Sequence, residues 1–111
     1  MHRVRVDIEH DLPVVVAEGE LDAFAAPDLE AALDEAGRRG NVLVDLERVS
    51  FMDSTALGLV ARAVRVHGEA GRLVRVVLPQ GSARRIFEIT ALDRALPVAP
   101  SRTEGVAELG R

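Results

Sequence analysis

Residues 42–66 read VLVDLERVSFMDSTALGLVARAVRV and decide the fold. The apolar run at 42–44 is short and rich in β-branched residues, which predicts a strand buried on both faces. A polar linker is expected at 47–50, before the triplet DST at 53–55, whose residue types favour helix N-caps. Apolar residues then recur at the spacing of a helix packed on a core, namely at Leu57, Val60, Ala61 and Val64. The stretch therefore predicts a strand, a loop and a helix.

Ser54 has two interpretations at the start of this helix. In the first, Asp53 or Ser54 caps the helix, which is worth about 1 kcal/mol. In the second, Ser54 is a phosphorylation site, because a phosphate at a helix N-terminus meets free backbone N–H groups and the positive end of the dipole. The fold should tolerate that charge, whereas a docked partner would face about −1.5 to −2 new charges beside Asp53.

The N-terminal part of the chain predicts a hairpin and a helix. Residues 3–9 alternate charged and apolar side chains, which indicates a strand with one wet face. Turn residues follow at 10–13, and residues 14–17 predict a second, more deeply buried strand that pairs antiparallel with the first. Pro27 favours the first turn of a helix, and the sequence RRG at 38–40 favours its end.

The C-terminal part continues the alternation of strands and helices. Residues 73–78 predict a strand parallel to residues 42–44, reached by a right-handed crossover. A short helix is expected at 83–90, a turn at 92–94 and a brief edge strand at 96–98. Ser101 and Glu104 have the spacing of a capping box ahead of a short last helix.

This order predicts an α/β fold in one domain, residues 1–111. We expect a mixed sheet of four to five strands, with an N-terminal antiparallel hairpin and about four helices packed on it. Asp22 and Ser54 fall in two loops that each follow a strand and precede a helix. Because partners and ligands of such sheets meet the loops beyond the carboxyl ends of the strands, we expect these two residues to be neighbours.

The composition excludes several classes of protein. The chain has no cysteine, which removes disulfide scaffolds, thiol catalysis and cysteine-based zinc sites and fits a cytoplasmic location. The apolar runs are shorter than the roughly 20 residues of a membrane span, and the first residues lack a signal-peptide pattern. Acids and bases are interleaved at a formal charge of −4, without the basic stripe that binds nucleic acid.

The common catalytic motifs are also missing. Without any lysine the chain has no phosphate-binding P-loop, and no Gly-x-Ser-x-Gly elbow or general base accompanies Ser54. Asp45 ends a buried strand, as in receiver domains, but their acidic pair and lysine are absent; we expect it to hydrogen bond the following loop. The histidines lack the spacing of metal ligands, namely His2, His10 and His67. We therefore expect no enzymatic activity, cofactor or metal.

Five motifs together resemble the STAS domain, and more narrowly the bacterial anti-sigma factor antagonists. They cover nearly the whole chain in order: GELD at 19–22, APDL at 26–29, VDL at 44–46, FMDSTALG at 51–58 and RIF at 85–87. The resemblance implies that Ser54 is the phosphorylated serine, with Asp53 before it and Asp22 in the neighbouring loop.

The resemblance also implies a partner-switching function in the control of transcription. The unphosphorylated protein would bind an anti-sigma factor that is also an ATP-dependent serine kinase, which frees the sigma factor. Phosphorylation of Ser54 would release the complex, and a phosphatase would reset it. The protein would act as a monomer or a weak dimer.

The residues around Ser54 are expected to contact the kinase. Thr55 is a second hydroxyl in the motif, and Gly58 matches the family pattern. The family commonly has glycine where this chain has Ala56, which would add a methyl group where a kinase approaches. Phe24 and Leu57 are either exposed apolar anchors for a partner or core residues, and the sequence does not decide between them.

Two other functions remain open. A STAS module without phosphorylation would serve as an adaptor subunit in a transport or sensory complex, and Ser54 would then be only a cap. A module binding a small molecule or nucleotide would use the loops of Asp22 and Ser54, although the chain has no phosphate-binding loop.

Overall fold

A computed structural model describes residues 1–110. The strands and helices are, in chain order, β1 (His2–Glu9), β2 (Leu12–Leu21), α1 (Ala26–Arg39), β3 (Val42–Met52), α2 (Ser54–Glu69), β4 (Val74–Val77), the 3-10 turn η1 (Gly81–Arg84), α3 (Arg85–Ile89), α4 (Leu92–Ala95) and α5 (Arg102–Leu109).

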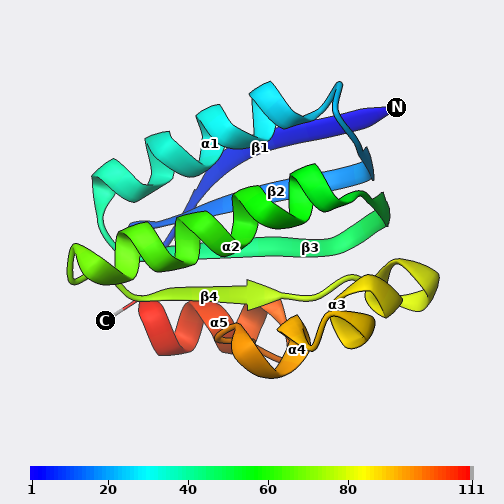
Figure 1. The fold of residues 1–111 in the computed structure, drawn as a ribbon. Helices are drawn as coiled ribbons and strands as arrows, with labels where there is room; N and C mark the ends of the chain where they lie inside the picture. Colours follow the sequence, from blue (N-terminus) through cyan, green and yellow to red (C-terminus); the bar gives the residue numbers. More distant parts are fainter. Residues whose placement is uncertain (111) are drawn as a thin grey trace.

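The described part of the chain forms one sheet with the strand order β1-β2-β3-β4. β1 pairs with β2 antiparallel, and β3 is parallel to both β2 and β4. Figure 1 shows α1 and α2 on one face of this sheet, while α5 packs against β3 and β4 from the other. The predicted α/β fold, with its mixed sheet and N-terminal hairpin, is confirmed.

The hairpin closes through His10 and Asp11, whose φ angles of 51° and 65° are left-handed. Glu9 lies opposite Leu12, so these two residues alone form the turn. Positive φ at both positions is type I′ geometry, whose twist matches that of the flanking strands. The turn is tighter than the predicted 10–13, because Leu12 and Pro13 already belong to β2 and are buried.

β3 is longer than the sequence predicts. Residues 47–50 were expected to form a linker, but they continue the strand as far as Met52, so that expectation was wrong. Within this segment only Val49 is buried, and its neighbours are exposed. A strand with one solvated face carries polar side chains, and in the sequence it looks like a loop. Register shifts between β2 and β3 also interrupt the alternation of side chains that marks a strand.

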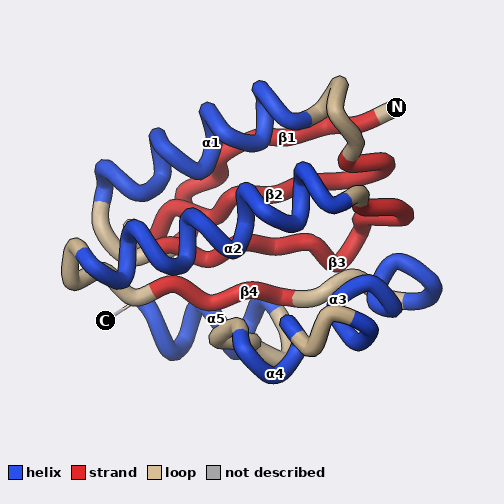
Figure 2. Tube along the Cα trace, in the orientation of Figure 1, coloured by secondary structure: helices blue, strands red, loops and turns tan. Residues whose placement is uncertain are grey.

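The sheet separates two apolar cores. Val15 and Val44 belong to the larger core, beneath α1 and α2. Val14 and Leu43, one residue earlier on the same two strands, belong to the smaller core beneath α5. Helices thus cover both faces of the strands here, which explains the continuous apolar runs that predicted them. Figure 2 shows these strands running side by side behind α1 and α2.

The segment after β4 differs in detail from the prediction. The helix expected at 83–90 is divided into η1 and α3, and the turn expected at 92–94 is the one-turn helix α4. Ala91 separates α3 from α4 with a left-handed φ of 60°. The expected edge strand at 96–98 is reduced to a single bridge between Val98 and Val76. No helix in residues 1–110 has the length and apolar character needed to cross a membrane.

α5 begins at the predicted cap. The backbone N–H of Glu104 donates to Ser101 Oγ at 3.2 Å, which satisfies one of the free donors of the first turn. Arg102, in the same turn, bridges to Glu9 at 2.9 Å and to Asp7 at 3.4 Å. These ion pairs join α5 to the edge strand β1.

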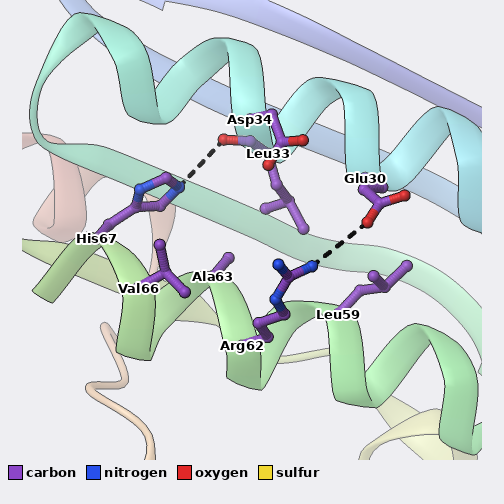
Figure 3. Close-up of a pocket in the computed structure, with 8 residues that line it drawn as sticks. All are labelled: Glu30, Leu33, Asp34, Leu59, Arg62, Ala63, Val66 and His67. Atoms are coloured by element: carbon purple, nitrogen blue, oxygen red, sulfur yellow. Dashed lines mark hydrogen bonds and ion pairs between the residues drawn. The ribbon is translucent and has the colours of Figure 1, made fainter. Parts of the chain in front are cut away.

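A buried histidine joins α1 to α2 (Figure 3). Nε2 of His67 lies 3.2 Å from the carbonyl oxygen of Leu33, and the imidazole packs on Gly37. A Cβ at position 37 would lie 1.9 Å from Cε1 of His67. The missing side chain of Gly37 therefore makes room for the ring, and Arg62 and Glu30 pair at 3.5 Å farther along the same interface.

We expect Gly37→Ala to destabilise the protein, although alanine is the better helix former. The new methyl displaces a ring held by a buried hydrogen bond, and such overpacking costs about 1–3 kcal/mol. The matched control is Gly68→Ala in α2, where the space around the new Cβ is open. This control should gain about 0.5–1 kcal/mol. Urea unfolding measures both changes, and equal effects would contradict the assigned role of Gly37.

Candidate functional site

The loops after β2 and β3 begin side by side at one edge of the sheet. Leu21 lies opposite Met52 at the ends of the two strands. The backbone N–H of Asp53 then donates to the carbonyl oxygen of Leu21 at 3.1 Å. This bond joins the chain just before Asp22 to the chain just before Ser54. The structure thus brings the two predicted loops together.

Asp22 shapes the loop that precedes α1. Its Oδ1 accepts hydrogen bonds from the backbone N–H groups of Phe24 at 3.0 Å and Ala25 at 3.2 Å. This local turn is a common use of aspartate. It leaves the Phe24 side chain 87% exposed. Of the two readings open for Phe24, the structure supports the exposed one.

Asp53, and not Ser54, caps α2. The backbone of Asp53 is extended, with φ −96° and ψ 178°, and its Oδ1 accepts from the backbone N–H of Ala56 at 2.9 Å. Ser54 is the first helical residue and is exposed. In residues 1–110 its hydroxyl makes no hydrogen bond to another side chain or to the backbone. The cap is therefore complete without Ser54.

The N-terminus of α2 around Ser54 can accommodate an added negative charge. The first turn of α2 contains no acidic residue, and the Asp53 carboxylate at the cap takes only the N–H of Ala56, so other N–H groups of this turn remain available to an anion. Thr55 and Gly58 are exposed nearby, and the space around Gly58 is open. In the described residues, no close contact requires a glycine at this position.

Ala56 and Leu57 lie on the inner side of the helix. They are 0% and 5% exposed and belong to the larger core. The expectation that the Ala56 methyl group meets an approaching kinase was therefore wrong, because that methyl group faces the protein interior. Leu57 is a core residue, which settles the second choice left open by the sequence.

An apolar groove lies at the end of β3, where Met52 lines it two residues before the serine, and the sequence did not predict it. It has a volume of about 330 Å³ between the end of β3 and η1–α3. Phe51 and Ile89 on its rim are 50% and 76% exposed. A helical signal was available, because Ile86 and Ile89 lie three residues apart while Phe87 fills the core. The groove depends on the extension of β3 to Met52, beyond the end of the predicted strand.

The remaining polar candidates have structural partners. Asp45 is 7% exposed, and its Oδ1 accepts from the backbone N–H of Glu47 at 3.0 Å. Nε2 of His2 lies 2.9 Å from Asp28 Oδ2. The cavity between α1 and α2 in Figure 3 measures only about 50 Å³ and is lined by His67 and Arg62, at a distance from the serine loop. No group of three or more metal-ligating side chains is found in residues 1–110.

We expect Asp53→Ala to lower the free energy of unfolding by about 1 kcal/mol, because a capping bond is lost. Ser54→Ala is the matched control and should stay within about 0.5 kcal/mol of the wild type, as exposed positions do. Chemical unfolding followed by circular dichroism measures both. A larger loss for Ser54→Ala than for Asp53→Ala would show that the hydroxyl, rather than the carboxylate, holds the helix end.

Comparison with known proteins identifies the family to which the chain is similar. Residues 3–105 match the STAS domain. An anti-sigma-B factor antagonist of Staphylococcus aureus is 36% identical over 82 residues, which cover 72% of this chain and 76% of that protein.

Solved structures share the fold. An anti-sigma factor antagonist from Mycobacterium paratuberculosis has a TM-score of 0.87 at 26% identity, over 100% of this chain and 96% of that one. The Bacillus cell fate determinant SpoIIAA in its phosphorylated form has a TM-score of 0.71 at 23% identity, over 96% and 98% of the two chains, and shows the fold alone. On the sequence match and the shared fold together, the chain belongs to the STAS domain family.

Proposed function

We propose that this protein is an anti-sigma factor antagonist that switches partners through phosphorylation of Ser54. In this function the unphosphorylated protein binds an anti-sigma factor with serine kinase activity and so releases a sigma factor. Transfer of the ATP γ-phosphate to the Ser54 hydroxyl ends the complex, and a phosphatase restores the serine. The protein is the substrate and adaptor in this cycle, and it acts in the cytoplasm. The names of its relatives support the class of partner.

The exposed hydroxyl beside an independent cap is the observation that carries this proposal. Asp53 holds the end of α2 through Ala56 N–H, and Ser54 contributes nothing to that bond. A phosphate on Ser54 would therefore leave the cap intact. Its effect on the fold through the helix dipole is only about 0.3–1 kcal/mol.

The same phosphate has a much larger effect on a partner that covers the site. Burying an uncompensated charge in an interface costs about 2–5 kcal/mol. At about 1.4 kcal/mol per factor of ten, this weakens binding by roughly 30-fold to several-thousand-fold. The Asp53 carboxylate next to the phosphate adds to the repulsion. Modification would thus control association while the protein stays folded.

The surface around Ser54 offers apolar contacts to such a partner. Phe24 is exposed in the loop after β2, and Phe51 and Ile89 are exposed where they line the groove. Exposed aromatic and aliphatic side chains beside a pocket are typical anchors of protein interfaces. Because Met52 lines the groove two residues before Ser54, we propose that one partner covers both the groove and the serine.

We expect Ser54→Asp to abolish binding of the anti-sigma factor while Ser54→Ala retains it. The partner is captured from native lysate, identified by mass spectrometry and then titrated by calorimetry. The matched control is Thr103→Asp, which adds the same charge to an exposed first-turn position of α5. Circular dichroism checks that all variants are folded. Equal binding by wild type, Ser54→Ala and Ser54→Asp would instead indicate an adaptor STAS module without a switch.

We expect Ile89→Ala to weaken binding of the same partner by about 1–2 kcal/mol, as truncation of an interface anchor does. Val66→Ala is the control, because Val66 is 40% exposed on α2 but lines the cavity at the other end of the helix. Neither change should alter the unfolding transition by more than about 0.5 kcal/mol. If the two variants bind alike, the groove is not part of the interface.

A further inference from the structure

β1 is a strand with one free edge. It ends the sheet, and β2 is its only neighbour in the described residues. Glu20 N–H donates to the carbonyl oxygen of Met1, its opposite residue, so odd-numbered residues of β1 hydrogen bond to β2. Hydrogen-bonded and non-bonded pairs alternate in antiparallel sheets. The backbone groups of His2, Val4, Val6 and Ile8 therefore point outward, and none of them is paired in the described part of the chain.

This edge lacks three of the usual protections against pairing. Natural edge strands are protected by prolines, by bulges or by shortness, and also by charged side chains, which β1 does carry. β1 spans eight residues without proline, and its register with β2 is unbroken from His2 to Glu9. Ile8 on the apolar side is 52% exposed. The strand is thus regular enough to pair with another strand along its whole length.

The basic and acidic side chains of β1 occupy different halves of the strand. Arg3 and Arg5 lie in the first half, and Asp7 and Glu9 lie in the second half on the same face. In an antiparallel pair, opposite residues point to the same face. When a second copy of β1 pairs with Val6 opposite Val6, Arg3 meets Glu9 and Arg5 meets Asp7. Within one chain Arg5 already bridges to Asp7 and Glu18, and Arg102 bridges to Asp7 and Glu9. The new contacts therefore extend existing ion pairs, and Arg3, which has no ion pair in the described residues, gains a partner in Glu9. On the other face Val4 meets Ile8.

Other registers are disfavoured by the same residues. A slip of one residue puts charged side chains opposite apolar ones. A slip of two residues puts Arg5 opposite Arg5, or Asp7 opposite Asp7, and like charges directly opposite are destabilising. Only the register centred on Val6 matches every charge with its opposite, so the pattern selects a second copy of this strand in one alignment.

We propose that two copies of this protein associate through β1, antiparallel and centred on Val6. The contact is a two-fold interface in which the same strand serves both copies. It completes the outward hydrogen bonds of Val4, Val6 and Ile8 and continues one sheet through both molecules. Since α1 packs over both β1 and β2, the two copies of α1 would lie about two strand spacings apart, or about 10 Å, a normal distance for packed helices.

This interface leaves the serine loop free. β2 separates β1 from β3, and Ser54 follows β3. Self-association is therefore compatible with binding of another protein at Ser54. The inference stands on the edge strand alone and does not depend on the proposed function.

The first test is sedimentation equilibrium between about 1 μM and about 1 mM, which covers dissociation constants of the same size. Wild type should approach the dimer mass as its concentration rises. Arg3→Glu should raise the dissociation constant at least about tenfold, because two symmetry-related attractive pairs become repulsive. Arg3 is exposed and makes no ion pair in the described residues. Arg94→Glu is the matched control on exposed α4 and should leave the constant unchanged.

The second test fixes the register with single cysteines, since the chain has none of its own. Residues opposite each other in a hydrogen-bonded pair have Cα atoms about 5.5 Å apart, within reach of a disulfide. Val6→Cys should therefore cross-link two copies under mild oxidation. Val4→Cys should not, because the two copies of residue 4 would lie about 13 Å apart along the strands.

Three outcomes would overturn the proposal. The first is a wild type that stays monomeric up to about 1 mM. The second is a dimer that Arg3→Glu and Arg94→Glu affect equally. The third is cross-linking of Val4→Cys as efficient as that of Val6→Cys. A concentration-dependent dimer with the expected charge and cysteine effects would establish the edge contact.

Discussion

Parallel pairing of β2 with β3 as far as their carboxyl ends is the constraint on which the site depends. The ladder reaches Leu21 and Met52, and one more hydrogen bond joins Asp53 to Leu21. If the strands ended where their apolar runs end, Asp22 and Ser54 would lie several residues into longer loops, and the ladder would no longer place them together. The extension of β3 also creates one wall of the apolar groove, with Phe51 on its rim. One backbone ladder thus sets the position of the serine, the neighbouring aspartate and the adjoining surface.

Much of the fold could be predicted because its signals are local. Apolar runs at 14–17 and 42–44 predicted buried strands, and Ser101 with Glu104 predicted a cap that the structure contains. Residues 47–50 misled the prediction because only one face of this part of β3 is covered, and polar side chains there look like a loop. The groove as a whole could not be predicted, because it forms between segments at least 30 residues apart and depends on where β3 ends.

The site itself was predicted in part. The motif placed Asp53 and Ser54 at the start of a helix, but a triplet of capping residue types cannot say which of them is the cap. Geometry settles the choice for Asp53. The sequence also could not separate Phe24, which is exposed, from Leu57, which is buried, because an apolar side chain near a helix end suits either environment. Burial is a property of the whole fold, and the local pattern does not contain it.

Selection for a stable fold acts on Asp53 and hardly on Ser54, because only the carboxylate holds the helix end. Descendants of this sequence could therefore replace the serine and still fold, whereas the aspartate would be retained because it caps the helix. A STAS domain built in this way can gain or lose a modifiable residue by a single substitution. Conservation of a hydroxyl at position 54 across related chains would thus report on regulation, whereas conservation at position 53 would report on folding.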